Sequence, residues 1–499
     1  MSSDHVRAIF GMKLRQFRER RGYTLKALAA RTGLSPSYLT EIEKGKKYPS
    51  AARIMQLAAA LGVAYDELVS LKLDQELDSL GAFLASPLLR EFPFQLFGVA
   101  PHDVLDLITR APHEASALIR AVGEVASRYD MRVEHLFYAA LRSYQEMHHN
   151  YFPELEEAAA RFVAERGWDP QVPPALEALA AVLTETYGYV LDDTALEAYP
   201  ELQGLRSVWI DATPPRLLLN RRLLPAQKAF VLGRELGYCY LGLRERAATS
   251  SPIEVNSFAQ VFNDFKASYF AGALLMNRER VVADLGAFLQ RRRWDGKAFL
   301  ALLARYRATP EMFFYRLSEL LPTFLHLPQL HFLRLHSVAG SGVYRLTKHL
   351  NMSHLPLPHG IDLHEHYCRR WLAVRLLREF AQRQQQGEGQ APLLGVQRSV
   401  FADSDAEYFC LSLARPLALT PGTNTSVTLG FRLDDAFKAT VRFWDDPAIP
   451  RLTINETCER CWLEACGERA APPHLFTQEA ARQRRHEALA RLKAAFGAS

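Results

Sequence analysis

The sequence predicts a multidomain α+β protein built from four consecutive parts. Two observations predict this order. Apolar residues recur at spacings of three and four over most of the first two thirds of the chain, and they alternate with polar residues after residue 326. The predicted parts are an all-α, five-helix domain over residues 1–72, a helical connector over 73–165, a mainly helical domain over 166–325 and an α/β domain with a cysteine-rich end over 326–499.

The first part carries the signals of five short helices within residues 13–69. Thr24 and Ser35 stand where the second and third helices are expected to begin, and their hydroxyls can cap those helices. Gly33 and Gly45 stand at the turns after these helices. The segment resembles the Cro-repressor-like helix-turn-helix family, in which the third helix enters the major groove of DNA.

Positive charge is concentrated in the same part. Residues 1–72 hold 13 Lys and Arg against 6 Asp and Glu, a net charge of +7, whereas the whole chain carries +5. Because such a charge suits the phosphates of nucleic acid, we expect binding to double-stranded operator DNA, as a homodimer. Candidates for base contact are Ser35, Ser37, Tyr38 and Thr40, and candidates for phosphate contact are Lys26, Lys44, Lys46 and Lys47.

Composition predicts a cytoplasmic protein that does not associate with membranes. The chain has no run of about 18 apolar residues, which a membrane-spanning helix needs. Its N-terminus lacks the long apolar core of a secretory signal. Six cysteines in 499 residues do not indicate a disulfide framework, and clustered cysteines in a cytosolic protein more often bind metal.

Two amphipathic helices in the third part, PAQKAFVLGRELGYCYLGL and FNDFKASYFAGALLMNRE, resemble the core of a zinc-peptidase-like family. In that family the first helix carries HExxH, whose two histidines bind zinc while the glutamate acts as general base. Here Arg234 and Tyr238 stand at the histidine positions, and Glu235 remains. Asp264 stands near the position of the family's acidic third ligand.

One carboxylate without two imidazoles does not hold a catalytic zinc ion, so we expect a peptidase-like scaffold that is not an enzyme. The carboxylate of Glu235 is then expected to form an ion pair within the fold. Its candidate partners are Arg234, Arg244 and Lys228.

The fourth part is expected to be a sheet with one long helix packed on it, an arrangement found in many small-ligand sensors. A helix is predicted over residues 364–386. Strands are predicted within 330–348 on either side of a turn at AGSG, and over 391–402, 406–419, 425–434 and 439–445.

The end of this part contains the motif C-x2-C-x4-C, formed by Cys458, Cys461 and Cys466. Three thiols within nine residues suit an iron–sulfur cluster or a structural zinc ion, and both usually have four ligands. Cys368 and Cys410 are the candidates for the fourth ligand.

The order of these parts resembles one family across nearly the full chain, the short-chain fatty acyl transcriptional regulators, which include activators of the methylcitrate and glyoxylate pathways. The resemblance rests on the helix-turn-helix, SYQEMHHNYFPELEEAAARF, the degenerate peptidase-like helices, FLRLHSVAGSG, CRRW and the terminal cysteine motif. It implies a sensor for short-chain acyl-CoA esters and, as in some members, a [4Fe–4S] cluster held by the C-terminal cysteines. Cys458, Cys461 and Cys466 match the cluster ligands of the family directly, and we choose Cys368, which precedes Trp371 in C-x2-W, as the fourth ligand. Relatives often have Cys at the position of Phe431 and Asp at that of His336.

An acyl-CoA site needs cations for the phosphates and an apolar slot for the acyl chain. The candidate cations are Arg334, Arg369, Arg398 and Arg415, and the candidate walls of the slot are Trp371, Tyr408 and Phe409.

We therefore expect a DNA-binding transcriptional regulator of short-chain fatty acid metabolism that responds to an acyl-CoA ester. Two alternatives stay open. One is a transcription factor whose only input is the redox state of an iron–sulfur cluster, and the other is a zinc peptidase that cleaves a partner repressor. Arg234 and Tyr238 argue against the peptidase.

Overall fold

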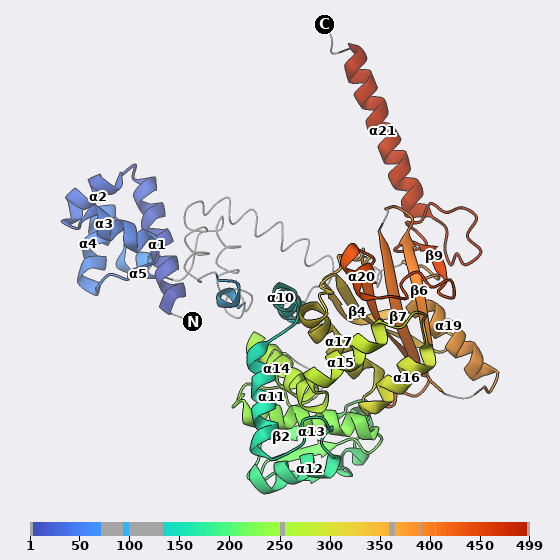
Figure 1. The fold of residues 1–499 in the computed structure, drawn as a ribbon. Helices are drawn as coiled ribbons and strands as arrows, with labels where there is room; N and C mark the ends of the chain where they lie inside the picture. Colours follow the sequence, from blue (N-terminus) through green and yellow to red (C-terminus); the bar gives the residue numbers. More distant parts are fainter. Residues whose placement is uncertain are drawn as a thin grey trace. The chain divides into compact units, whose positions relative to one another are not determined.

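The computed structural model describes residues 3–70, 93–98, 133–249, 255–358, 365–388, 391–404 and 406–496 (Figure 1). The chain divides into two compact units: Met1–Tyr144 with Asn256–Phe258, and Gln145–Val255 with Ala259–Ser499. Most of the predicted connector falls on residues 71–92 and 99–132, outside the described ranges. None of the described helices has the length and apolar character needed to cross a lipid bilayer.

The first unit contains the five predicted helices, α1 (Ser3–Arg20), α2 (Leu25–Thr32), α3 (Pro36–Glu43), α4 (Ala51–Leu61) and α5 (Tyr65–Val69). They bury one apolar core that includes Leu14, Leu28, Leu39 and Leu57. Helix α1 begins earlier than the predicted start at Leu14. The unit also holds the short 3-10 helix η2 (Phe94–Phe97) and most of α10 (Val133–Met147).

The predicted caps of α2 and α3 are confirmed. The hydroxyl of Thr24 accepts a hydrogen bond from the Ala27 amide, and the hydroxyl of Ser35 accepts one from the Tyr38 amide, both at 3.1 Å. These bonds satisfy amides that have no partner within the helix itself. Gly33 ends α2 with φ +67°, a backbone conformation that favours glycine, and so sets the sharp turn into α3.

The second unit contains two sheets. The smaller has the strand order β1-β3-β2, and the larger has the order β5-β4-β8-β7-β6-β9. In the larger sheet only β6 and β9 pair in parallel, among the described strands. The strands are β1 (Val190–Asp192), β2 (Ser207–Ile210), β3 (Arg216–Leu219), β4 (Leu330–Val338), β5 (Arg345–Asn351), β6 (Leu393–Phe401), β7 (Glu407–Pro416), β8 (Thr423–Arg432) and β9 (Arg451–Ile454).

Helices pack around both sheets (Figure 1). The α-helices that follow α10 are α11 (Pro153–Glu165), α12 (Leu176–Ala181), α13 (Pro225–Tyr240), α14 (Phe258–Leu275), α15 (Arg278–Leu289), α16 (Gly296–Arg305), α17 (Pro310–Phe324), α19 (Leu372–Gln385), α20 (Asp435–Thr440) and α21 (His474–Phe496). Shorter turns of helix are η3 (Val182–Thr186), η4 (Ala195–Ala198) and η5 (Pro200–Leu202).

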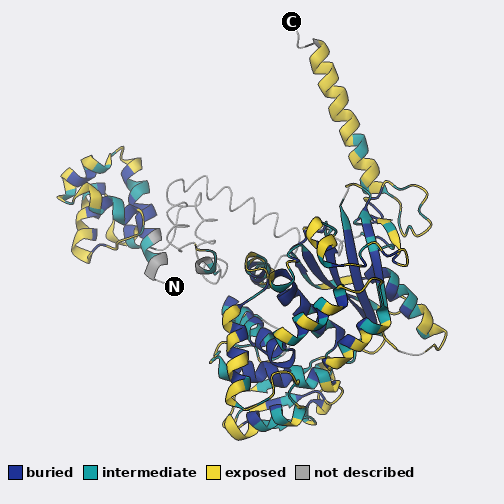
Figure 2. Cartoon of the chain, in the orientation of Figure 1, coloured by how far each residue is buried: buried dark blue, intermediate teal, exposed yellow. Residues whose placement is uncertain are grey.

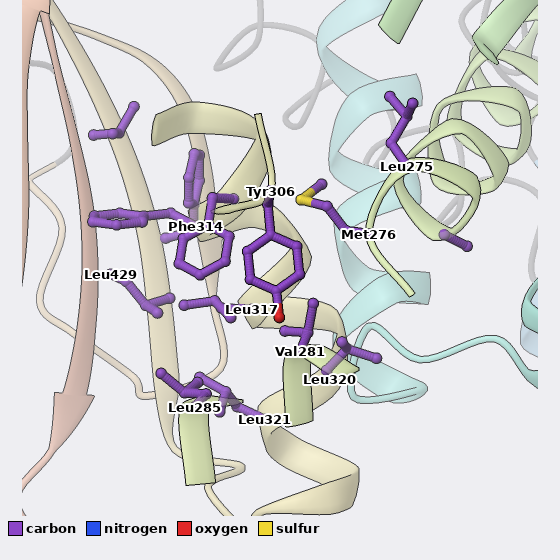
Figure 3. Packing of buried hydrophobic residues seen from close by; sticks show 14 of the residues in the cluster. Leu275, Met276, Val281, Leu285, Tyr306, Phe314, Leu317, Leu320, Leu321 and Leu429 are labelled. Atoms are coloured by element: carbon purple, nitrogen blue, oxygen red, sulfur yellow. The ribbon is translucent and has the colours of Figure 1, made fainter. Parts of the chain in front are cut away.

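The large sheet is covered on both faces, by α17 on one and by α19 on the other. Phe314 and Leu317 of α17 share a core with Leu429 of β8 (Figure 3). Val374 and Leu377 of α19 belong to a second core on the opposite face. The strands between these helices are buried along most of their length (Figure 2).

The first of these cores joins parts that the sequence treats as separate domains. It contains residues of α11, α13, α14, α15 and α17 together with residues of the large sheet. Residues 145–165, which the sequence assigns to the connector, therefore pack as part of the second unit. Because these helices and the large sheet share one apolar core, moving one of them relative to the others would expose apolar surface to water.

A buried ion pair fixes α17 to α11. The Arg316 guanidinium donates to both carboxylate oxygens of Glu156, at 2.6 and 3.0 Å, and to Glu319 at 2.9 Å. Tyr269 of α14 donates its hydroxyl to Glu156 as well, at 2.8 Å. Because charged groups in a core are tolerated only when paired, this network ties three helices to one geometry.

The strand predicted over residues 439–445 is wrong. Asp434 accepts a hydrogen bond from the Phe437 amide at 2.8 Å, and this cap starts α20, after which the chain turns. Val441 and Phe443 are buried in the core, which explains why the segment has a strand-like apolar pattern. The pattern also missed β9 and the small sheet, whose strands are only three or four residues long.

Candidate functional site

The first turn of α3 presents the side chains predicted to contact bases. Ser35 and Ser37 are exposed, and Tyr38 and Thr40 are partly exposed. Two of the four hydroxyls are already engaged: that of Ser35 caps the helix, and that of Thr40 donates to the Pro36 carbonyl oxygen at 2.8 Å. Ser37 and Tyr38 are therefore the side chains best placed to contact base edges.

Cations surround this turn. The predicted phosphate contacts Lys26, Lys44, Lys46 and Lys47 are all exposed. Arg53 was not among the predicted contacts, and its guanidinium lies 4.7 Å from the centre of the Tyr38 ring. Lys47 lies 5.7 Å from the same ring and forms an ion pair with Glu41 at 2.6 Å. The surface around α3 thus combines side chains that can hydrogen-bond to base edges with cations that can contact the phosphate backbone of DNA.

The inner side of α3 is fixed to α1. The Arg18 guanidinium donates to both carboxylate oxygens of Glu43, at 2.6 and 2.9 Å, and to the Tyr23 carbonyl oxygen at 2.9 Å. A Cβ at Gly11 would lie only 2.3 Å from the Ile42 carbonyl oxygen, so α1 approaches the backbone of α3 directly. This packing determines the direction in which the exposed turn of α3 points.

The degenerate peptidase-like segment on α13 is held by a network of charges. Glu235 is 1% exposed, and both of its carboxylate oxygens accept hydrogen bonds of 2.6 Å from Arg246. Tyr189 donates its hydroxyl to Glu235 at 2.7 Å. The predicted partners were wrong, because Arg246 on the loop after α13 forms the pair. Arg246 also stacks on the rings of Trp209 and Tyr238, 4.3 and 4.0 Å from their centres.

The two residues at the histidine positions pair with the third predicted position. Arg234 donates to the Asp264 carboxylate at 2.7 Å, and the Tyr238 hydroxyl donates to the same oxygen at 3.2 Å. Burial raises the pKa of Tyr238, and the nearby Asp264 adds to the increase. The sequence therefore placed Arg234, Tyr238 and Asp264 correctly in one site, which holds a hydrogen-bonded ion pair.

The C-terminal cysteines lie beside the segment that precedes α19. The Cys368 amide donates to the Glu456 carbonyl oxygen at 3.1 Å, and the Cys458 amide donates to that of His366 at 2.9 Å. Burial raises the pKa of the Cys368 thiol, and the sulfurs of Cys458 and Cys461 add to the increase. The chain thus brings the Cys368 thiol, which is distant in sequence, into the neighbourhood of Cys458 and Cys461.

An arginine organises the loop between the motif cysteines. Arg469 donates to the carbonyl oxygens of Cys458, Cys461 and Leu463, at 2.7, 3.1 and 2.6 Å. The Ala470 amide donates to the Cys458 sulfur at 3.3 Å. The thiols are chemically suited to iron or zinc, but no three His, Cys, Asp or Glu side chains of the described chain are arranged as metal ligands. All six cysteines are free thiols, and Cys410 instead accepts from the Ser399 hydroxyl at 3.8 Å.

The residues predicted to wall an acyl slot do not face one space. Tyr408 and Phe409 are adjacent on β7 and point to opposite faces of the sheet, since side chains alternate along a strand. Trp371 lies on the face of Tyr408, where its indole donates to the Asn455 carbonyl oxygen at 2.7 Å. Phe409 lies in the core on the other face. The prediction that the three line one slot is therefore wrong.

Of the four predicted cations, the fold brings two together. Arg334 and Arg415 both act on the carboxylate of Glu311, the second residue of α17. Arg398 pairs with Glu407 at 2.8 Å, and Arg369 donates to the Gly342 carbonyl oxygen at 3.0 Å. The last two therefore have separate local roles.

Comparisons with known proteins match two regions of the chain. Residues 14–68 match the family described as "Helix-turn-helix", and residues 195–318 match the "IrrE N-terminal-like domain". The protein is 45% identical over 60 residues to the uncharacterized HTH-type transcriptional regulator YazB of Bacillus subtilis, which covers 12% of this chain and 87% of that protein.

A longer match extends beyond the DNA-binding domain. The HTH-type transcriptional regulator RamB of Mycobacterium tuberculosis is 22% identical over 300 residues, which is 53% of this chain and 57% of RamB. A solved structure described as a Mycobacterium tuberculosis transcriptional regulator is 18% identical and covers 67% of this chain and 94% of its own, with a TM-score of 0.45. The match over residues 14–68 and the similarity to YazB show that the chain belongs to the helix-turn-helix transcriptional regulators, and the match over residues 195–318 shows an IrrE-like domain after its DNA-binding domain.

Proposed function

We propose that this regulator binds operator DNA as a homodimer through α3 and that its second unit senses a short-chain acyl-CoA ester. The observation that carries DNA recognition is the exposed first turn of α3, with Ser37 and Tyr38 beside Arg53 and Lys47. The opposite side of α3 is fixed by Arg18 and Glu43, so the turn is presented rigidly. In modules of this kind the N-terminal residues of the third helix reach the base edges.

Two features support an acyl-CoA effector. The motifs of the chain follow the order found in short-chain fatty acyl regulators, and cations gather at one end of the large sheet around Glu311. A nucleotide thioester presents phosphates that such cations attract. The ester can change DNA affinity only if it binds one arrangement of the dimer more tightly than another. A coupling of about 1–3 kcal/mol corresponds to a roughly 5–150-fold change.

A fluorescence-anisotropy titration of the full chain tests this function. Operator DNA is first selected from random duplexes, and its affinity is then measured with and without acetyl-CoA, propionyl-CoA and butyryl-CoA. We expect at least one ester to change the affinity about fivefold or more. The redox-only alternative predicts that oxidation changes the affinity while no ester does, and that result would remove the acyl-CoA proposal.

We also propose that Cys368, Cys458, Cys461 and Cys466 hold a [4Fe–4S] cluster, with structural zinc as the alternative. The support is the donor chemistry of four thiols, three of them buried in one neighbourhood. Anaerobic purification followed by iron, zinc and sulfide analysis distinguishes the two metals. Cys368→Ser is expected to lower the metal content, whereas Cys410→Ser serves as the control. A wild-type protein that contains neither metal after anaerobic purification would contradict both versions.

We further propose that the IrrE-like domain has no peptidase activity. The support is that Glu235 is bound by Arg246 and Tyr189, while Arg234 and Tyr238 stand where a peptidase needs two imidazoles. A proteolysis assay with added zinc is expected to show no cleavage by the wild type. Cleavage that disappears in Glu235→Gln would overturn this proposal and support the peptidase alternative.

A further inference from the structure

A row of polar side chains crosses three neighbouring strands of the large sheet. His336 of β4 lies opposite Thr425 of β8, and Thr425 lies opposite Arg415 of β7. Directly paired residues of antiparallel strands point to the same face, so the three side chains stand side by side. Their face is the one that α17 covers, because Phe409 and Leu413, which share this face on β7, belong to the α17 core.

This row has hydrogen-bonding capacity that the described protein does not use. The Nε2 atom of His336 and the Oγ1 atom of Thr425 are buried and have no hydrogen-bond partner. Arg415 is 8% exposed, and its one hydrogen bond among the described residues runs to the Pro416 carbonyl oxygen at 3.4 Å. Buried polar atoms almost always have partners, so two unsatisfied atoms beside an arginine with one long hydrogen bond indicate a missing partner.

Positive charge surrounds the same row. Arg334, Arg206, Lys348 and Arg415 all act on the carboxylate of Glu311 at the start of α17. Arg334 donates to Glu311 at 2.6 Å, and Arg206 lies 3.8 Å from it. One carboxylate therefore faces four basic side chains. A second carboxyl, Glu319, also acts on Lys348, but burial raises its pKa to about 8, so it is mainly neutral at pH 7.

The electrostatics of this cluster favour a further anion. Burial by itself raises the pKa of Glu311, yet the cations lower it to about 2. Burial lowers the pKa of Lys348 to about 8 and also lowers the pKa of Arg415. The shifts of Lys348 and Arg415 mean that these two cations lose hydration without full compensation by the negative charge nearby.

We propose that His336, Thr425 and Arg415, with Arg334 and Lys348, form a binding site for a phosphate-type anion of a small ligand, and that Glu311 is its internal counter-anion. A phosphate or diphosphate group offers several acceptor oxygens to a guanidinium, a hydroxyl and an imidazole N–H at once. This site deepens the proposed function. It rests on the proposed acyl-CoA sensing only for the identity of the ligand that carries the phosphates.

Glu311 gives the site a built-in competitor. In the free protein its carboxylate occupies Arg334. An arriving phosphate shares or takes over that guanidinium, and the carboxylate then loses part of its stabilisation. Removing the charge of Glu311 should therefore strengthen anion binding, whereas removing a cation should weaken it. Opposite effects from neighbouring residues are a signature that general damage to the fold does not produce.

Calorimetric titration of the full chain with pyrophosphate, coenzyme A and propionyl-CoA tests the site. We expect Arg415→Gln to weaken binding of all three about tenfold or more, because charge-assisted hydrogen bonds are lost. Glu311→Gln is expected to tighten pyrophosphate binding several-fold. Arg398→Gln is the matched control, since Arg398 lies on the same sheet and pairs with Glu407 instead. Thermal unfolding of each variant confirms that it is folded.

The outcomes separate this inference from the proposed function. If propionyl-CoA binds and Arg415→Gln leaves its affinity unchanged, the site is overturned while acyl-CoA sensing stands. If pyrophosphate binding depends on Arg415 but the wild type does not bind propionyl-CoA at all, the anion site stands and the acyl-CoA effector fails. If pyrophosphate at millimolar concentration does not bind the wild type, or binds the Arg415→Gln variant equally well, the inference fails.

Discussion

Arg246 and Glu235 form a buried bidentate pair, with both hydrogen bonds 2.6 Å long, at the position where a zinc peptidase of this type carries its general base. The guanidinium is enclosed by the Trp209 and Tyr238 rings, so water has little access to either charge. A pair in this setting makes each charge depend on the other, because an isolated buried charge is costly.

The first prediction concerns this pair. Arg246→Met is expected to lower the free energy of unfolding of the second unit by about 3–5 kcal/mol, since it leaves Glu235 buried without a counter-ion. The double variant Arg246→Met with Glu235→Gln should recover a large part of the loss. Urea unfolding measures both, with Lys228→Met as the control because Lys228 pairs with a half-exposed Asp193. A double variant no more stable than Arg246→Met would contradict this account.

The second prediction concerns the packing of α1 on α3. Gly11→Val is expected to cost about 1–3 kcal/mol, because overpacking forces the backbones apart, and also to weaken DNA binding through the displaced α3. Gly204→Val is the control, since a Cβ there meets no atom within 4 Å. Circular dichroism melting and anisotropy with the selected operator provide the two readouts. Unchanged DNA affinity together with lower stability would show that α3 keeps its direction.

The third prediction concerns phosphate contact. Lys44→Ala is expected to weaken binding to all DNA sequences by a similar factor and to reduce the slope of log K against log salt by about 1. Ser37→Ala should instead change the preference among operator sequences and leave the slope unaltered. Anisotropy titrations at several salt concentrations measure both quantities. Lys297→Ala, a change to an exposed lysine of the second unit, should alter neither.

The fourth prediction concerns Glu319, whose pKa burial raises to about 8 from an ordinary value of 4.5. A carboxyl that binds its proton more tightly in the folded state stabilises the fold below pH 4.5, and this contribution disappears as the pH rises through 8. Between pH 7 and 9 the wild type should therefore lose stability relative to Glu319→Gln, which has no proton to release.

Urea unfolding at pH 7, 8 and 9 measures this difference between the two proteins. Lys348 titrates in the same range and interacts with Glu319, so the comparison is repeated with Lys348→Met in both proteins. Glu157→Gln, at an exposed position on α11, should follow the wild type at every pH. Parallel curves for wild type and Glu319→Gln would mean that Glu319 is ionised in the folded protein at pH 7.

Features that depend on neighbours in sequence could be predicted. The caps at Thr24 and Ser35 and the turn at Gly33 depend on residues within four positions, and they set the start of α2, its end and the start of α3. The same local reading was wrong at 439–445, where a buried turn has the apolar pattern of a strand. The spacing of apolar residues indicates which side chains are buried. It does not distinguish a short strand from a buried turn, because both can show the same apolar pattern.

Features that depend on the path of the chain could not be predicted. Several arginines lie near Glu235 in sequence, and only the course of the loop over Trp209 selects Arg246. The row from His336 to Arg415 requires the register of three strands, which long-range packing sets. The sequence identified Arg334 and Arg415 by residue type alone, and it gave no means of separating them from Arg369 and Arg398.

Helix α17 connects the cation cluster around Glu311 to the buried ion pair between Arg316 and Glu156. Its first turn carries Glu311 beside the cations, and Arg316, about 7.5 Å further along the axis at 1.5 Å per residue, holds Glu156 of α11. A displacement of Glu311 along this axis would therefore act on Glu156 of α11 through Arg316. Because α11 begins at Pro153, nine residues after Tyr144, where the first unit ends, such a displacement would act close in sequence to the boundary between the two units.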